Sequence, residues 1–190
     1  MTMEEKLKEY ARLAVVTGLA VKPGQEVMIS ASVEVADFVH LVMEQAYKAG
    51  ASDVVVEWMD SEAAKLRYQH SYMEKISQCP EWTSLMRNTM AQRGAAFLSI
   101  RSDDPRVLAD VDPKKPAAAQ KASRNACGPF VEAHRNGTMP WCIIGAASPK
   151  WAQAVFPDLP EQEALDRLWD AIFQTARVDS GDAVAAWEAH

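Results

Sequence analysis

The stretch that decides the fold is Asp53-Val54-Val55-Val56-Glu57-Trp58. Its three consecutive valines show no alternation between apolar and polar residues, and valine favours extended backbone. An unbroken apolar run of this kind is typical of a strand that is covered on both sides, as in a parallel sheet. We therefore expect residues 53–58 to form a strand that is buried on both faces.

Three further apolar runs have the length of strands, and segments of helical length separate all four. These runs are residues 26–30, 95–100 and 139–146. Strands that alternate with helices imply right-handed crossovers between parallel neighbours. The expected fold class is therefore α/β, with an open, mainly parallel sheet of about four or more strands and helices on both faces.

Capping and turn residues define the elements near the amino terminus. Thr2 and Glu5 have the spacing of a capping box, which predicts a helix directly after them. We expect Gly18 to end that helix in the left-handed conformation. Lys22-Pro23-Gly24-Gln25 has the composition of a tight turn, and Ser32 is positioned to cap the next helix.

The middle of the chain is predicted to be mostly helical. Residues 61–93 should form helix that is broken near Cys79-Pro80. Asp104-Pro105 and Asp112-Pro113 each place a capping oxygen before a proline at the first helical position. We expect the second of these pairs to open a long helix that runs towards Gly137.

The last part of the chain contains three more predicted helices. Ser148-Pro149 starts a short helix that Pro157 ends, and Pro160 starts the next one. Asp182 caps the final helix, residues 183–190, which has neither a glycine nor a proline to end it. We therefore expect the natural protein to continue beyond this helix.

Length and charge limit the class of protein. The chain has 190 residues, which suits one domain, and its formal net charge is −6 at pH 7. Nucleic acids and anionic membranes both require a concentrated positive surface, so neither is an expected partner. The start of the chain lacks a signal-peptide pattern, and no apolar run is long enough to cross a bilayer. We expect a cytoplasmic protein.

Polar residues that follow the predicted strands are the candidates for a ligand site. In an open parallel sheet, ligands lie beyond the carboxyl ends of the strands. Asp60, Asp103 and Asp104 follow two of those ends and are candidates for lining a polar crevice. The simpler interpretation is that Asp104 and Ser148 cap helices and that Asp60 is a turn residue. No glycine-rich loop follows a strand, so the patterns for dinucleotides and phosphates are absent.

The residue types that perform catalysis are present but scattered. No two of the four histidines, which are His40, His70, His134 and His190, have the spacing of a zinc-binding helix. His70 and His134 are expected to face solvent. The three cysteines, which are Cys79, Cys127 and Cys142, are widely separated, so we expect reduced thiols without a disulfide or a nucleophilic role. The residues alone predict no catalytic, cofactor-binding or metal-binding side chain.

An ordered set of short motifs runs along the whole chain. Its members are Ala49-Gly50-Ala51-Ser52-Asp53-Val54-Val55-Val56-Glu57-Trp58, Asp104-Pro105, Met139-Pro140-Trp141-Cys142, Pro149-Lys150-Trp151-Ala152, Val155-Phe156-Pro157, Glu163-Ala164-Leu165, Leu168-Trp169, Arg177-Val178-Asp179 and the spaced pair Trp187 and His190. Together they resemble the aminopeptidase T family of metallopeptidases. The sequence departs from that family's pattern at Asp182-Ala183, where Asp-Pro would be expected.

The resemblance implies a two-domain cytoplasmic enzyme, usually a homodimer, that removes N-terminal residues from peptides. It also implies two divalent metal ions, of the zinc or cobalt type, bound by side chains of the second domain. On this basis residues 1–182 are expected to be the α/β N-terminal domain. Residues 183–190 are expected to begin a linker helix to a missing C-terminal catalytic domain, so the chain alone should be inactive. Apolar surface around Val184 and Trp187 should then be exposed.

Two other functions stay open at this point. One is a stand-alone domain that binds a small molecule in the crevice at the C-terminal ends of the strands. The other is an interaction module without enzymatic activity.

Overall fold

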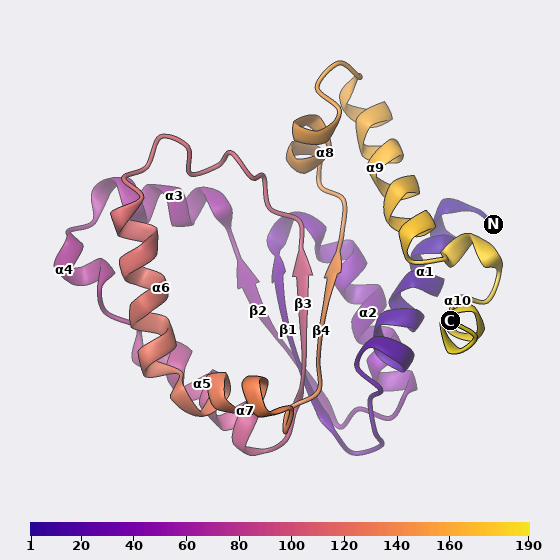
Figure 1. Ribbon diagram of the computed structural model, residues 1–190, viewed down its shortest axis with the longest axis horizontal. Coiled ribbons are helices and arrows are strands. Elements are labelled where there is room, and N and C mark those ends of the chain that lie inside the picture. Colours follow the sequence, from indigo (N-terminus) through magenta and orange to yellow (C-terminus); the bar gives the residue numbers. More distant parts are fainter.

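The computed structural model describes residues 1–190 and is built on one parallel sheet. Its strands are β1 (Glu26–Ser32), β2 (Asp53–Met59), β3 (Ala96–Arg101) and β4 (Trp141–Gly145). They lie in the order β2-β1-β3-β4, and every neighbouring pair is parallel (Figure 1). The predicted α/β class and all four predicted strands are confirmed.

The prediction that residues 53–58 are buried on both faces is wrong. Strand β2 lies at one edge of the sheet, where Val54 is its only buried residue and Trp58 is exposed. The strand that is buried along almost its whole length is β1, which lies between β2 and β3. Apolar content identified the strands, whereas burial depends on strand order, which one run of valines does not specify.

Five helices cover one face of the sheet. These are α1 (Met3–Leu13), α2 (Ala36–Lys48), α8 (Pro149–Val155), α9 (Glu161–Thr175) and α10 (Ala183–Glu188), which Figure 1 shows together on one side. The main hydrophobic core lies between them and the strands. Phe38 of α2 connects the layer, because its ring centre lies 5.5 Å from those of both Tyr10 and Trp169.

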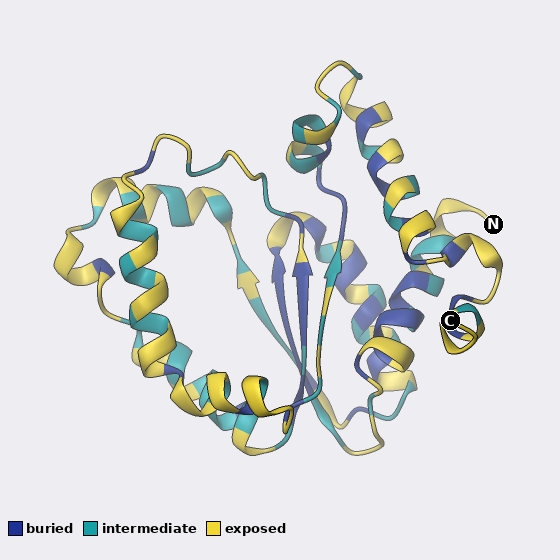
Figure 2. Ribbon diagram, in the orientation of Figure 1, coloured by how far each residue is buried: buried dark blue, intermediate teal, exposed yellow.

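The other face is covered by five more helices that form an arc. These are α3 (Ser61–His70), α4 (Met73–Ile76), α5 (Glu81–Gln92), α6 (Lys114–Ala126) and α7 (Gly128–Asn136). Figure 2 shows how little of this layer is buried, and α3 and α6 contain no buried residue at all. A small second core around Met28, Met90 and Ala95 joins α5 to the sheet. Helices therefore lie on both faces, as predicted, but the two layers are unequal.

The first helix ends differently from the prediction. After Leu13 the backbone widens into a π-helical turn, η1 (Ala14–Gly18), and the left-handed residue is Ala20, with φ 49°. Gly18 instead allows the π-helical turn to lie close to Cys142 on β4. A Cβ atom at this position would lie 2.9 Å from the Sγ atom of Cys142 on β4, closer than such atoms normally come.

Two predicted helices in the middle of the chain also change. No helix follows Asp104-Pro105, because Asp104 Oδ1 accepts the backbone N–H of Arg106 at 2.9 Å and closes a turn. The long helix predicted after Asp112-Pro113 is divided at Cys127 into α6 and α7. Pro129 explains the division, since it has no N–H to donate to the preceding turn and its ring would clash with the carbonyl four residues before it, while it is tolerated in the first turn of α7.

Several predicted caps are confirmed. Thr2 and Glu5 form a capping box, Ser148 accepts the N–H of Trp151 at the start of α8, and Asp182 accepts that of Ala185 in α10. Ser32 caps a short 3₁₀ turn, η2 (Val33–Val35), that leads into α2. No helix combines the length and apolar character that crossing a membrane would require.

Candidate functional site

At the carboxyl edge of the sheet, where a ligand crevice was predicted, buried serines lie in the loops that follow β3 and β4. The chain runs from β1 to β2 on one side and then crosses to β3 on the other, so the crossovers diverge between β1 and β3. Ser148 Oγ donates to the carbonyl oxygen of Ser102 at 2.7 Å and so connects the loop after β3 to that after β4. The Oγ atom of Ser102 is itself buried without a partner.

Each of the three candidate carboxylates forms a hydrogen bond or an ion pair with a residue two or three positions away in the sequence. Asp60 caps α3, where its Oδ1 accepts the N–H groups of Glu62 and Ala63 at 2.9 and 3.0 Å. Asp103 forms an ion pair with Arg101 at 3.0 Å, and Asp104 closes the turn described above. Both carboxylates have the local kind of role that was expected, but the two assignments are reversed. Asp60, expected in a turn, caps α3, whereas Asp104, expected to cap a helix, closes a turn.

Lys150 is a charged residue at the same edge that the sequence did not identify as a site residue. Its Nζ atom lies 2.5 Å from Glu62 Oε1 and 3.8 Å from Glu34 Oε1. The hydrogen bond to Glu62 raises the pKa of Lys150 above its ordinary value. All three side chains are substantially exposed, so these ion pairs position the helices that follow β1, β2 and β4 with little net stabilisation.

Three of the four histidines lie far from one another in the fold. His40 on α2 packs edge-on against Trp58, with ring centres 6.4 Å apart. His70 is exposed at the end of α3, as predicted, and His190 Nδ1 lies 2.9 Å from Arg177 Nη2. They come from different elements and do not converge on a common point.

The fourth histidine does not face solvent as predicted. His134 on α7 stacks on Trp141 with ring centres 4.4 Å apart, and its ring also lies 6.0 Å from those of Phe97 and Phe130. Its Nδ1 atom is buried without a partner, and burial lowers the pKa of the imidazole. The prediction failed because the neighbours of His134 in space are aromatic, whereas its neighbours in sequence are polar.

The side chains of this chain do not fit a metal site. No group of three or more histidine, cysteine, aspartate or glutamate side chains is arranged to hold an ion. The three cysteines are free, and the candidate carboxylates have the local contacts given above.

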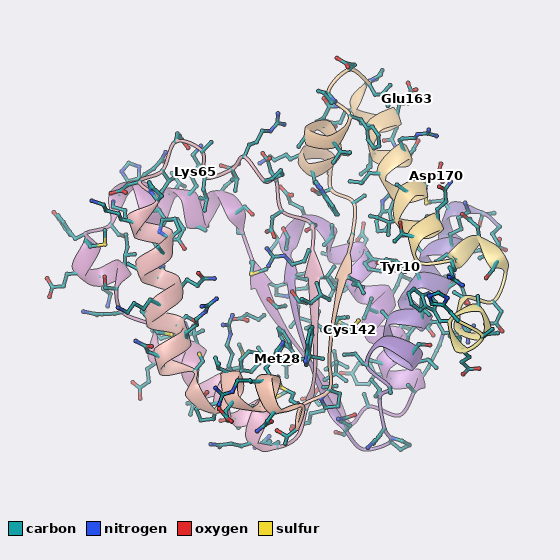
Figure 3. All side chains as sticks on the ribbon, viewed as in Figure 1. Tyr10, Met28, Lys65, Cys142, Glu163 and Asp170 are labelled. Carbon is teal, nitrogen blue, oxygen red and sulfur yellow. The ribbon has the colours of Figure 1, made fainter.

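The second candidate site is an apolar groove that the sequence did not predict. It has a volume of about 660 Å³ and lies between α1 with η1, strand β4, and α9 with α10. Leu13, Ile144, Ile172 and Trp187 are among its lining residues, none of which is charged. Tyr10 and Cys142, which also line it, lie on the α1 side of β4 in Figure 3.

Two polar contacts hold the walls of this groove in place. The hydroxyl of Tyr10 donates to the carbonyl oxygen of Gly145 at 3.0 Å, and burial raises the pKa of that hydroxyl above its ordinary value. The indole N–H of Trp187 donates to the carbonyl oxygen of Ala176 at 2.9 Å. Trp187, which lines the groove, is exposed as predicted, whereas Val184, named with it, is buried against the core.

The fold and these two sites define an α/β scaffold without a metal-ligand set of its own. Residues 3–190 match the model of the thermophilic metalloprotease family M29, so the chain belongs to that family. It is 41% identical over 189 residues to aminopeptidase AmpS of Bacillus subtilis, covering 100% of this chain and 46% of that protein. It is 42% identical over 187 residues to aminopeptidase T of Thermus thermophilus, covering 98% of this chain and 46% of that protein.

A solved structure shows the same architecture. Wild-type AmpT from Thermus thermophilus matches with a TM-score of 0.89 and 40% sequence identity, covering 100% of this chain and 46% of that one. The chain therefore spans about half the length of the relatives it matches. The family resemblance drawn from the sequence motifs is confirmed.

Proposed function

We propose that this chain is the amino-terminal, non-catalytic half of a cytoplasmic metal-dependent aminopeptidase that removes N-terminal residues from peptides. The observation that carries the proposal is the family match, together with the share of the relatives' length that this chain covers. The relatives are named aminopeptidases, and the chain aligns with 46% of their length. The net charge of −6 disfavours nucleic acid or an anionic membrane as a partner.

The catalytic centre in this proposal lies outside residues 1–190. Two divalent ions, of the zinc or cobalt type, would be held by the part of the enzyme that this chain does not cover. The dispersed histidines and the locally paired carboxylates of this half support that location. The present half would form a wall of the substrate chamber and contribute to a homodimer of the full-length enzyme.

Residues 1–182 form the N-terminal domain in this proposal, and residues 183–190 begin the linker helix. The junction is fixed to α1 by two contacts. Arg12 Nη2 lies 2.6 Å from Asp182 Oδ1, and the N–H of Ala183 donates to Glu9 Oε1 at 2.8 Å. The first turn of α10 therefore has a defined direction relative to the domain.

The test is an activity assay of the 190-residue chain. We expect no hydrolysis of leucine-para-nitroanilide with added cobalt or zinc, and no stoichiometric metal after dialysis. Full-length aminopeptidase AmpS of Bacillus subtilis, assayed in parallel, is the positive control. Clear turnover by the 190-residue chain, or one tightly bound ion per chain, would contradict the proposal that the catalytic centre lies outside residues 1–190.

A further inference from the structure

Strand β4 has one hydrogen-bonded edge and one free edge. The N–H of Phe97 donates to the carbonyl of Pro140, and the N–H of Ala146 donates to that of Arg101, both at 2.8 Å. Backbone groups alternate in direction along a strand, and β3 and β4 are in continuous parallel register between these two bonds. The even-numbered residues of β4 therefore turn their backbone towards β3.

The odd-numbered residues of β4 point their backbone groups away from the sheet. These are Trp141, Ile143 and Gly145, and none of their N–H groups has a partner on that side. Of their carbonyls, that of Gly145 accepts the hydroxyl of Tyr10, and that of Ile143 has only a long contact of 3.9 Å from the thiol of Cys142. The side chains of Trp141 and Ile143 are 45% and 57% exposed. Such a row of open donors and acceptors is a template for another strand.

The apolar groove lies directly beside this free edge. Ile143 and Gly145 belong to its lining, together with Trp151 on α8 and Ile172 on α9. Open backbone groups next to an uncharged groove suit one kind of ligand, an extended segment that pairs through its main chain and buries apolar side chains. A charged or helical ligand would leave the strand edge unpaired.

We propose that an extended apolar segment, from the part of the aminopeptidase outside residues 1–190, adds to β4 as a fifth strand and fills the groove. The inference rests on the proposed function. The relatives are more than twice as long as this chain, which covers 46% of them, so they contain ample sequence for such a strand. Trp187 places α10 in the groove wall, so a chain continuing from α10 would start beside the groove.

The experiment uses the 190-residue chain and peptides of known sequence. Overlapping short peptides covering the part of Bacillus subtilis aminopeptidase AmpS that lies outside the match are titrated into the isotope-labelled chain. We expect one set of overlapping peptides to bind and to slow hydrogen exchange at the amides of Trp141, Ile143 and Gly145. Methylation of alternate backbone nitrogens in that peptide should abolish binding, because it removes the donors that pair with β4.

A proline substitution tests the edge itself. Ile143→Pro removes the central outward N–H and leaves the bonds between β4 and β3 in place, since those use the neighbouring residues. We expect affinity to fall about tenfold, while the matched variant Ile143→Val keeps it. Unchanged amide shifts in β1 and β3 confirm the fold of both variants. If Ile143→Pro is unfolded, the test is the binding of the methylated peptide to the unaltered chain, which should be abolished.

Four results would overturn the inference. Absence of binding by every peptide is one, and binding that leaves the β4 amides unprotected is another. If peptides of unrelated sequence that alternate apolar and polar residues bind equally well, the edge would instead bind peptides in general, as a substrate site does. Protection that grows with the concentration of the chain alone would indicate a second copy at this edge. None of these readouts depends on hydrolysis, so they are independent of the activity assay that tests the proposed function.

Discussion

The environment of His134 makes the stability of the protein depend on pH. The ring stacks on Trp141 and its Nδ1 atom is buried without a partner, so burial lowers the pKa of the imidazole in the folded state. When the pKa of a histidine is lower in the folded than in the unfolded protein, the unfolded protein binds the proton at a higher pH than the folded protein does. Its neutral form therefore contributes stability that is lost as the pH falls through the ordinary histidine value of about 6.5.

We expect the free energy of unfolding to decrease between about pH 8 and about pH 5.5 by less in His134→Phe than in the unaltered chain. Phenylalanine keeps the aromatic packing and removes the titratable group. Urea denaturation at the two pH values measures the difference. An equal decrease in both proteins would show that His134 protonates without hindrance in the fold.

Gly18 allows the π-helical turn to lie against β4. A Cβ atom at this position would meet Cys142 Sγ at 2.9 Å and Cys142 Cβ at 3.5 Å. We expect Gly18→Ala to destabilise the protein by about 1–3 kcal/mol through overpacking. In a Cys142→Ala background the sulfur is absent, so the same change should cost less. A double-mutant cycle measures this coupling, and additive effects would contradict the assigned contact.

At the scale of elements, Ser148 joins three segments. It is fully buried, donates to the carbonyl of Ser102 and caps α8 by accepting the N–H of Trp151. We expect Ser148→Ala to lower the free energy of unfolding by about 2 kcal/mol, because a cap and a buried bond are both lost. The control is Ser77→Ala, the same change at an exposed residue, with an effect within about 0.5 kcal/mol. Equal effects of the two substitutions in chemical denaturation would argue against this role.

Sequence patterns predicted which elements exist better than they predicted their surroundings. The valines at 54–56 identified β2, but its edge position follows from the order of all four strands, which is a long-range property. Pro129 carried the signal that divides α6 from α7, since proline interrupts helical hydrogen bonding. Asp104-Pro105 carried no such signal, because the same pair suits a helix start and a turn.

At the scale of the whole molecule, the two sites differ in how far sequence could predict them. A ligand crevice at the carboxyl edge was predicted only from the rule that the ends of parallel strands meet at one edge, and it stays a prediction. Local roles for its carboxylates were expected, but sequence did not tell a cap from a turn, since Asp60 caps α3 where a turn was expected. The groove was missed because its lining comes from α1, β4, α8, α9 and α10, and the residues on each element look like ordinary core positions. Only the tertiary arrangement leaves them uncovered.

An open apolar groove should bind a fluorescent apolar dye, and the full-length enzyme should cover it. We expect the dye anilinonaphthalene sulfonate to bind the 190-residue chain. Ala171→Glu should weaken that binding strongly, because Ala171 is an exposed lining residue and the new carboxylate would repel the anionic dye. Ala117→Glu makes the same change at an exposed position on α6, far from the groove, and should leave binding unaltered.

The same measurement on full-length aminopeptidase AmpS of Bacillus subtilis compares the groove in the longer protein. A segment that fills the groove excludes the dye, so we expect much weaker fluorescence per molecule than for the 190-residue chain. Titration at fixed dye concentration gives both affinities directly. Equal dye binding by the two proteins would mean that the groove stays open in the full-length enzyme. An unchanged signal in Ala171→Glu would place the dye elsewhere on the chain and remove the groove from the explanation.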